Sequence, residues 1–221
     1  MDVLDAMRGR TASRAFLARP VESATVEAIL EAARWAPSGA NTQPWRVAVL
    51  AGAPKQRLGE ALLAARASGR PARPEYDYYP REWFEPYKAR RRTCGLAMYG
   101  ALGIGLEDKF AREQAWNRNY QFFGAPTGLL FFIDPRLAKG SWLDLGMFIQ
   151  NVMLAARGLG LATCPQASIA EYPDIVRREL GIGNTWRVVC GMALGHPDPD
   201  APVNRYRTER EPVSSFTTWY T

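Results

Sequence analysis

The residues of this sequence best suited to chemistry are arginines near its two ends. Arg10 and Arg14 belong to the segment RTASRAF, which places the hydroxyl groups of Thr11 and Ser13 between them. Guanidinium groups stay charged and bind phosphate through paired hydrogen bonds. Two arginines at this spacing can therefore converge on one anionic group. The alternative is a solvated basic turn, because most arginines in folded proteins are exposed.

A second group of arginines lies in the C-terminal segment NRYRTEREP, which contains Arg205, Arg207 and Arg210. Three guanidinium groups so close in sequence also suit an anionic ligand. Taken alone, the segment is more typical of a solvated charged tail.

Two further segments carry polar groups that can contact a ligand. The first is PSGANTQPW at 37–45, where Ser38 and Asn41 offer donors and acceptors and Gly39 lets a backbone approach closely. The second follows GLGLATCP at 158–165, where the backbone N–H groups of a non-helical loop are free to donate. Each segment alone is also compatible with an ordinary turn.

The composition disfavours several classes of function. The one histidine, His196, lies between a glycine and a proline, so neither a histidine-rich metal site nor a Ser-His-Asp triad is expected. The three cysteines show no CxxC pairing, which favours reduced thiols over disulfides. The net charge of +6 suits nucleic acid, but the arginines are spread along the chain without a recognisable nucleic-acid-binding module. Neither a metal nor a nucleic-acid partner is expected.

The elements that must position these residues alternate between helices and strands. Apolar periodicity, prolines and glycines predict helices at 2–8, 25–35, 54–67, 88–109, 110–120, 141–156 and 173–180, and strands at 46–50, 128–133 and 186–194. Ser141 and Asp144 have the spacing of a capping box. Three strands among a larger number of helices indicate an α+β fold with a small sheet.

The length of 221 residues fits a single domain, 1–221. No segment approaches the roughly 20 apolar residues of a membrane span, and the N-terminus lacks the apolar core of a signal peptide. A cytoplasmic protein with no membrane partner is therefore expected. Residues 68–87 are rich in prolines and aromatics, which predicts an ordered excursion. The tail at 196–221 has aromatics without a core of its own, so it is expected to pack on another surface, with a second subunit as one candidate.

In order and spacing, these segments resemble the nitroreductase family. The most specific piece is ARWAPSGANTQPW at 33–45, placed after the R-x-x-S-R-x-F segment near the N-terminus. GLGLATCP and the arginine cluster before Pro212 fall where the family has them, so the resemblance spans nearly the whole chain. It implies a small, mostly antiparallel central sheet flanked by helices, in an intertwined homodimer with exchanged C-terminal tails.

Proteins of this family carry FMN without a covalent bond, and the resemblance implies which residues hold it. Arg10 and Arg14 would lie on one side of the cofactor, with Arg207 or Arg210 on the other. Ala12 stands where the family frequently has serine, so one hydroxyl contact is lost. The resemblance leaves two hydroxyls to compensate, those of Thr11 and Ser13.

The remaining cofactor contacts come from the two polar segments. The resemblance implies that Pro37, Ser38 and Gly39 reach the flavin from the other subunit, with Asn41 close by. Backbone groups just after Pro165, at Ala167 and Ser168, would face the flavin N5 atom, where hydride arrives and leaves. No side chain is assigned as a catalytic acid or base, because the cofactor carries the difficult chemistry.

The implied reaction is ping-pong hydride transfer from NADPH or NADH to a nitroaromatic, a quinone or a similar electron-poor small molecule. Residues 68–123 would form a lid-like excursion over the flavin. Its expected substrate-facing aromatics are Tyr87, Tyr120, Phe122 and Phe123. Two alternatives stay open. One is the same fold with other flavin chemistry, such as reductive dehalogenation, ring oxidation or flavin consumption, and the other is a non-catalytic flavin-binding protein.

Overall fold

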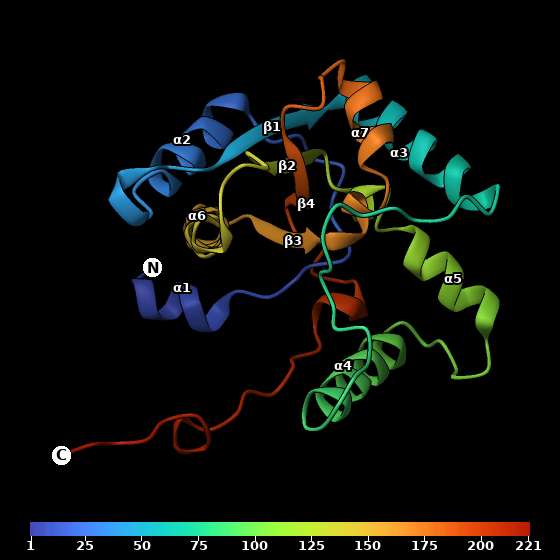
Figure 1. Cartoon of the computed structure of the whole chain (residues 1–221). Coiled ribbons are helices and arrows are strands. Elements are labelled where there is room, and N and C mark those ends of the chain that lie inside the picture. The colour runs from blue at the N-terminus through green and yellow to red at the C-terminus, as the bar shows by residue number, and fades with distance from the viewer.

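The computed structural model describes residues 1–221 (Figure 1). Its helices are α1 (Val3–Gly9), α2 (Ser23–Ala33), α3 (Gly52–Ala67), α4 (Tyr87–Ala101), α5 (Lys109–Asn117), α6 (Lys139–Gly158) and α7 (Pro173–Leu180). Its strands are β1 (Arg46–Ala51), β2 (Thr127–Ile133), β3 (Ala162–Gln166) and β4 (Arg187–Gly195). Apart from the helix predicted at 88–109, every predicted element lies within three residues of its expected bounds.

The four strands form one antiparallel sheet in the order β1-β2-β4-β3. This arrangement confirms the predicted α+β fold with a small antiparallel sheet. Every residue of β2 is buried. Successive side chains of a strand point to opposite faces, so a strand covered on both faces needs apolar residues at every position. The uninterrupted run GLLFFI meets that requirement.

The core lies on both faces of the sheet. Leu130 and Phe132 of β2 pack in a cluster with residues of α3 and α7. The alternate residues Leu129 and Phe131 pack in a second cluster with residues of α2 and α6. Figure 1 shows these two helix pairs on different sides of the sheet. The sheet is therefore held between two helical layers, and its edges and strand ends are left to carry a site.

The sequence patterns miss β3, because the strand is short and contains Pro165. Proline has no N–H to donate and is tolerated in edge strands, and β3 lies at one edge of the four-stranded sheet. Its register pairs Pro165 with Met192 of β4. The stretch expected to be a free loop after Pro165 is instead the end of β3 followed by the 3-10 helix η3 (Ala167–Glu171).

Two local predictions are wrong. The helix predicted at 88–109 ends at Ala101, and Gly103 then adopts a φ of 68°, which breaks the helix before α5. The capping box is also not formed. Helix α6 begins at Lys139, and its N-cap residue Ala138 makes no side-chain hydrogen bond. Ser141 already lies inside the first turn, where it cannot serve as the N-cap.

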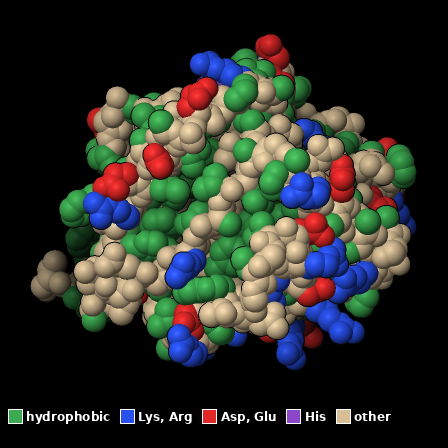
Figure 2. Space-filling view, turned by 90° about the horizontal axis from the view of Figure 1, so that it is seen from above, with side chains coloured by type: hydrophobic (Ala, Val, Ile, Leu, Met, Phe, Trp, Pro, Cys, Tyr) green, Lys and Arg blue, Asp and Glu red, His purple; other side chains and the backbone are tan.

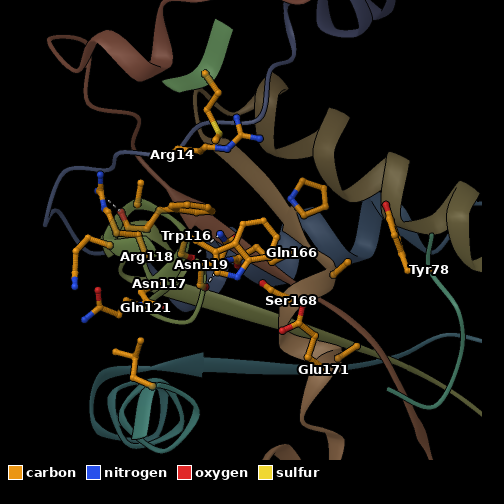
Figure 3. A pocket seen from close by; sticks show the side chains of 18 of the residues that line it. Arg14, Tyr78, Trp116, Asn117, Arg118, Asn119, Gln121, Gln166, Ser168 and Glu171 are labelled. Atoms are coloured by element: carbon orange, nitrogen blue, oxygen red, sulfur yellow. Dashed lines mark hydrogen bonds between the residues drawn. The ribbon is translucent and has the colours of Figure 1, made fainter. Parts of the chain in front are cut away.

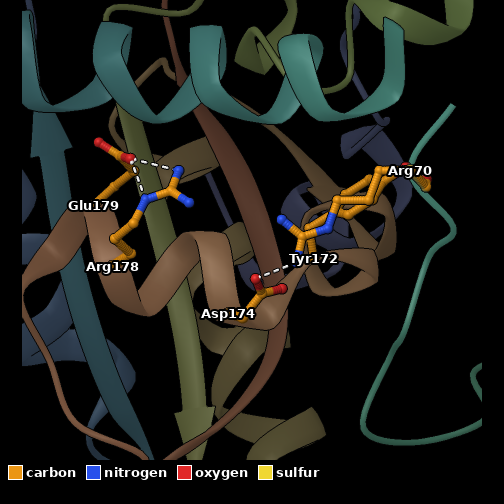
Figure 4. A network of polar contacts seen from close by, with 5 residues as sticks. All are labelled: Arg70, Tyr172, Asp174, Arg178 and Glu179. Atoms are coloured by element: carbon orange, nitrogen blue, oxygen red, sulfur yellow. Dashed lines mark hydrogen bonds and ion pairs between the residues drawn. The ribbon is translucent and has the colours of Figure 1, made fainter. Parts of the chain in front are cut away.

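The start of the aromatic excursion is fastened to α7 and the turn before it. Arg70 Nη2 lies 2.5 Å from Asp174 Oδ2, and the Tyr172 hydroxyl donates to the Arg70 carbonyl over 3.2 Å (Figure 4). The Arg73 N–H donates to the Glu171 carbonyl over 2.9 Å. The ion pair is about half exposed and contributes at most roughly 1 kcal/mol. Together these contacts place the excursion beside η3.

Helix α4 and the C-terminal tail project away from the sheet (Figure 1). No residue of α4 is buried, and an ion pair of 2.9 Å between Arg90 Nε and Glu211 Oε1 joins the helix to the tail. Near the end of the tail, Trp219 is 80% exposed and Tyr220 is 93% exposed. No helix of the structure has both the length and the apolar character needed to cross a membrane.

Candidate functional site

The N-terminal arginine segment runs alongside β3. The Ser13 N–H donates to the Thr163 carbonyl over 3.0 Å, and Ala12 forms a parallel bridge with Thr163. Thus Arg10 and Arg14 lie on either side of the point where the chain touches the sheet edge. This contact brings together two segments that the sequence analysis identified separately.

A large cavity of about 1130 Å³ opens at one end of this pair of segments. Its walls include Arg14, Pro165, Ala167 and Ser168, four of the residues expected to contact the cofactor. The other walls come from the aromatic excursion, from α5 and the turn after it, and from η3, including Tyr76, Tyr78, Tyr79, Trp116, Asn119, Phe123 and Glu171. Figure 3 shows Arg14, Trp116, Ser168 and Glu171 around this space. Its volume and mixed lining are those of a site for a small molecule or cofactor.

Arg14 is held at the cavity without an acidic partner. Its Nη1 donates to the Tyr206 hydroxyl over 2.7 Å and to the Ala12 carbonyl over 3.2 Å. The backbone N–H of Arg14 donates to Asn204 Oδ1 over 2.8 Å. Burial raises the pKa of Tyr206, and the Arg14 charge opposes that rise. The C-terminal segment thus positions the N-terminal guanidinium while leaving its charge available to a ligand.

A smaller cavity of about 220 Å³ lies at the other end of the two segments. Arg10, Thr11 and Arg207 line it, and Arg207 Nη1 donates to the Arg8 carbonyl over 3.2 Å. The pKa of Arg10 is lowered, first by burial and then by the charges of Arg210 and Arg207. None of Arg10, Arg207 and Arg210 forms an ion pair with a carboxylate. Uncompensated cations crowded around a cavity form a site for an anion.

The two tail arginines that the sequence left undecided differ in position. Arg207 lines the small cavity, whereas Arg210 does not. Arg210 Nη1 instead donates to Thr208 Oγ1 over 2.7 Å and to the Glu209 carbonyl over 2.9 Å. Arg210 is nevertheless close enough for its charge to lower the pKa of Arg10.

Several buried polar atoms along these cavities have no hydrogen-bond partner within the chain. Ser168 Oγ and Gln166 Oε1 are such atoms at the large cavity, and Thr163 Oγ1 and Arg157 Nε at the small one. Buried polar groups in folded proteins are nearly always paired, so unpaired ones beside a cavity are suited to a bound polar ligand. The cavity walls therefore fit a ligand with polar groups along its length and an anion at one end.

Glu171 supplies a carboxylate at the wall of the large cavity. The Tyr120 hydroxyl donates to Glu171 Oε2 over 2.5 Å. Burial and this hydrogen bond raise the pKa of Tyr120, so the phenol remains a proton donor to the carboxylate. In Figure 3 the Glu171 side chain points toward Ser168. Neither Glu171 nor Gln166 is signalled by the sequence, because each becomes part of the site only through the turn from β3 into η3.

The 37–41 segment lies at neither cavity of the same chain. Its 3-10 helix η1 (Gly39–Asn41) is fastened to α6, where Asp144 Oδ2 accepts from the Gly39 N–H over 3.3 Å. Ser38 Oγ accepts from the Gln43 N–H over 3.0 Å. Within one chain, Pro37, Ser38, Gly39 and Asn41 are thus separate from the other expected cofactor contacts.

Of the four aromatics expected to face substrate, only Phe123 lines the large cavity. Tyr120 and Phe122 are expected at the substrate, but the structure places both side chains fully buried in the core cluster that contains α3 and not on the cavity wall. The Phe122 ring is wedged against β2, since a Cβ at Gly128 would lie 2.6 Å from Phe122 Cε1. Tyr87 is 48% exposed at the start of α4 and lies outside the cavity wall.

Neither the two buried cysteines nor a cluster of acids offers another reactive centre. Cys94, Cys164 and Cys190 are free thiols, and burial raises the pKa of Cys164 to about 11 and that of Cys190 to about 12. Protonated thiols are poor nucleophiles. No three His, Cys, Asp or Glu side chains come together where they could hold a metal ion.

Comparisons with known proteins point to one family. The sequence model of the Nitroreductase family matches residues 7–196. The chain is 42% identical over 208 residues to a 4-nitrobenzoate reductase of Pseudomonas putida, covering 94% of this chain and 91% of that protein. It is 39% identical over 216 residues to a nitrobenzene nitroreductase of Ectopseudomonas oleovorans, covering 97% of this chain and 95% of that protein.

Solved structures agree with the sequence comparisons. The crystal structure of the FMN and NADPH-dependent nitroreductase NfnB from Sphigopyxis sp. strain HMH superposes with a TM-score of 0.97 at 39% identity, over 100% of both chains. The NADPH complex of NfnB from Mycobacterium smegmatis gives a TM-score of 0.94 at 34% identity, over 99% of this chain and 97% of that one. In fold and in sequence along its whole length, this chain belongs to the nitroreductase family.

Proposed function

We propose that this protein is an FMN-dependent reductase that uses NADPH or NADH to reduce nitroaromatic or similarly electron-poor small molecules, and that it works as a homodimer. The observation that carries the proposal is the pair of joined segments 10–14 and 162–168. They have a cationic cavity at one end and a large, partly aromatic cavity at the other. FMN has the matching shape, a phosphate at the end of a polar chain that bears a flat ring.

The residues present fit this cofactor. Arg10 and Arg207 at the small cavity would hold the phosphate, and Thr11 lies beside them. Ala12 contributes backbone contacts only, and its carbonyl already accepts from Arg14. The ring would lie against Pro165, Ala167 and Ser168, whose unpaired hydroxyl is available to it. When bound, FMN supplies the redox chemistry, taking two electrons and a proton from a nicotinamide and passing them to an oxidised acceptor.

The chain's own contribution is positioning, exclusion of water and electrostatics. Arg14 places a cation at the wall of the large cavity, where it stabilises negative charge that develops on a bound ring. The Tyr206 hydroxyl and Asn204 hold Arg14 in place, so no reorganisation is needed when charge appears. The backbone of η3 presents Ala167 and Ser168 to the same space.

Flat aromatic acceptors suit the remaining walls. Tyr76, Tyr78, Tyr79 and Trp116 line the cavity, and aromatic faces attract electron-poor rings in offset stacks. The relatives named for 4-nitrobenzoate and nitrobenzene support nitroaromatics as the acceptors. The NADPH-dependent structural relatives support NADPH as the electron donor.

The homodimer rests on surfaces that one chain leaves open. Trp35, Leu143 and Met147 are exposed. Leu143 and Met147 belong to α6, whose opposite side packs against the sheet. Figure 2 shows hydrophobic side chains gathered over the left and centre of one face, with lysine and arginine side chains scattered among and around them. A second copy would cover such a surface, receive the aromatic tail and bring Pro37, Ser38, Gly39 and Asn41 to the neighbouring cofactor.

A cytoplasmic location completes the proposal. Three free cysteines, none paired, suit a reducing compartment.

The test is the visible spectrum of the purified protein, followed by addition of NADPH and then of 4-nitrobenzoate or nitrobenzene. We expect a yellow protein that is bleached by NADPH and recovers its colour when the nitroarene is added, in a particle of twice the chain mass of 24.6 kDa. A colourless protein that takes up no FMN would contradict the proposal. Bleaching without turnover of either nitroarene would favour other flavin chemistry on the same fold.

A further inference from the structure

The small cavity contains two polar groups that the sequence did not single out. Thr163 is only 1% exposed, and its Oγ1 has no hydrogen-bond partner. Arg157, in the last turn of α6, also lines the cavity, and its buried Nε is unpaired. A buried hydroxyl or guanidinium nitrogen without a partner costs free energy, which a ligand bound in the cavity can recover.

The fold fixes the position of the Arg157 guanidinium. A Cβ built on Gly9, the last residue of α1, would lie 3.1 Å from Arg157 Nη2 and 3.3 Å from Nε. The guanidinium therefore lies directly against the end of α1, and glycine at position 9 leaves room for it. A rigidly placed guanidinium loses less side-chain entropy on binding than a free one.

The charges around the cavity favour an anion. Arg10, Arg157, Arg205 and Arg207 line it, against the single carboxylate of Asp198. Only Arg205 has an ion-pair partner, Asp200 at 3.5 Å. A small anion with several acceptor oxygens would satisfy unpaired donors from three parts of the chain at once.

The two cavities are lined by residues of the same strand, β3. Thr163 lines the small cavity and Gln166 the large one, and they are three residues apart in the same strand. Three residues of extended chain span roughly 10 Å. That is the order of the reach of a ribityl chain ending in a phosphate.

We propose that Arg157 and Thr163 are phosphate-binding residues for FMN, acting with Arg10 and Arg207. This inference rests on the proposed function and adds to it the last turn of α6 and the first residues of β3. The Arg157 guanidinium, which lies against the end of α1, donates to the phosphate as a charged group. The Thr163 hydroxyl donates to a phosphate oxygen. Neither group touches the ring, so both act on the phosphate alone.

The competing role is structural, with Arg157 serving only to pack α6 against α1. Two variants separate the roles, Arg157→Met, which keeps most of the apolar stem, and Thr163→Val, which keeps the shape and removes the hydroxyl. Flavin-free protein is titrated with FMN and, separately, with riboflavin, which lacks the phosphate. Flavin fluorescence gives the dissociation constants, and thermal unfolding of the flavin-free protein reports folding. Arg136→Met is the matched control, because Arg136 is exposed and pairs with Asp134.

We expect Arg157→Met to raise the Kd for FMN by roughly ten- to a hundredfold while the Kd for riboflavin changes less than about twofold. Thr163→Val should weaken FMN binding by about tenfold, yet leave the Tm of the flavin-free protein unchanged or higher, because it removes a buried unpaired hydroxyl. Arg136→Met should alter neither constant.

Equal losses of FMN and riboflavin affinity, or no loss of either, would overturn the assignment for that residue. If Arg157→Met does not fold, the assignment is tested with Arg157→Lys and Thr163→Val, by comparing the change in the Kd for FMN with the change in the Kd for riboflavin. Failure of the unaltered protein to bind any flavin would be a different result, because it would refute the proposed function itself.

Discussion

Replacing Gly191 by alanine should displace η3 at the wall of the large cavity, because the added methyl group would collide with Ile169. Gly191 lies in β4 opposite Gln166 of β3, and an added Cβ would be 2.6 Å from Ile169 Cγ1 and 3.2 Å from Ile169 Cβ. Carbon atoms in contact are normally about 3.5–4.0 Å apart, so roughly 1 Å of movement is required. Ile169 is fully buried within η3, the short helix that also carries Ala167 and Ser168.

The cost follows from that geometry. Forcing a methyl group into a packed core destabilises a protein by about 1–3 kcal/mol. For a chain of this length, that corresponds to a Tm roughly 2–12 °C lower. Displacement of η3 should also reduce nitroarene turnover, because a misplacement of about 1 Å at a reacting centre can cost up to about a hundredfold in rate.

Thermal unfolding at one fixed protein concentration measures the first effect, and steady-state turnover the second. Gly100→Ala in α4 is the matched control, since a Cβ there meets nothing within 4 Å. Combining Gly191→Ala with Ile169→Ala should relieve the clash, so the double variant should lose at least about 1 kcal/mol less than the sum of the two single losses. Additive losses, or a Gly191→Ala variant as stable as Gly100→Ala, would refute the reasoning.

The remaining predictions concern the core and the thiols. Phe122→Ala should lower the free energy of unfolding in urea by about 3–5 kcal/mol, because the ring is buried, and a variant of normal stability with only an altered KM would restore Phe122 to the substrate wall. A thiol reagent at pH 8 should label at most Cys94 in the native protein and all three cysteines in denaturant, and rapid native labelling of all three would contradict their burial. Burial raises the pKa of Cys164 from 9.0 to about 11 and that of Cys190 from 9.0 to about 12. The neutral thiols therefore stabilise the fold fully below pH 9, and this contribution is lost as the pH rises toward 11–12; a Tm that does not fall between pH 8 and pH 10.5 would count against it.

The sequence predicts the elements well where their own pattern is strong. The apolar run of β2 and the proline at the start of α7 locate both elements, since each is determined by residues within it. The break after Ala101 and the strand β3 are missed. Gly103 resembles any helical glycine until its positive φ is known, and β3 exists only because β4 offers it an edge.

The residues of the site also separate into those that local sequence identifies and those that only tertiary packing brings to the cavities. Arg10 and Arg14 are identified from residue type, spacing and family resemblance, which leave Arg207 and Arg210 as alternatives, and the structure places Arg10, Arg14 and Arg207 at the two cavities. Arg157 and Glu171 are not identified, because only tertiary packing brings the end of α6 and the end of η3 to those walls. The positions of aromatic residues are the hardest to predict, because the same large apolar side chains are common both in a buried core and on a cavity wall.

The most direct test of the account is the ratio of the dissociation constants of riboflavin and FMN for the unaltered protein. Two or more arginines gathered around one phosphate, each contributing about 1.5 kcal/mol or more, should make FMN bind at least about a hundredfold more tightly than riboflavin. Equal affinities would mean that the arginines from the two ends of the chain do not meet at a flavin phosphate, and would contradict the central claim.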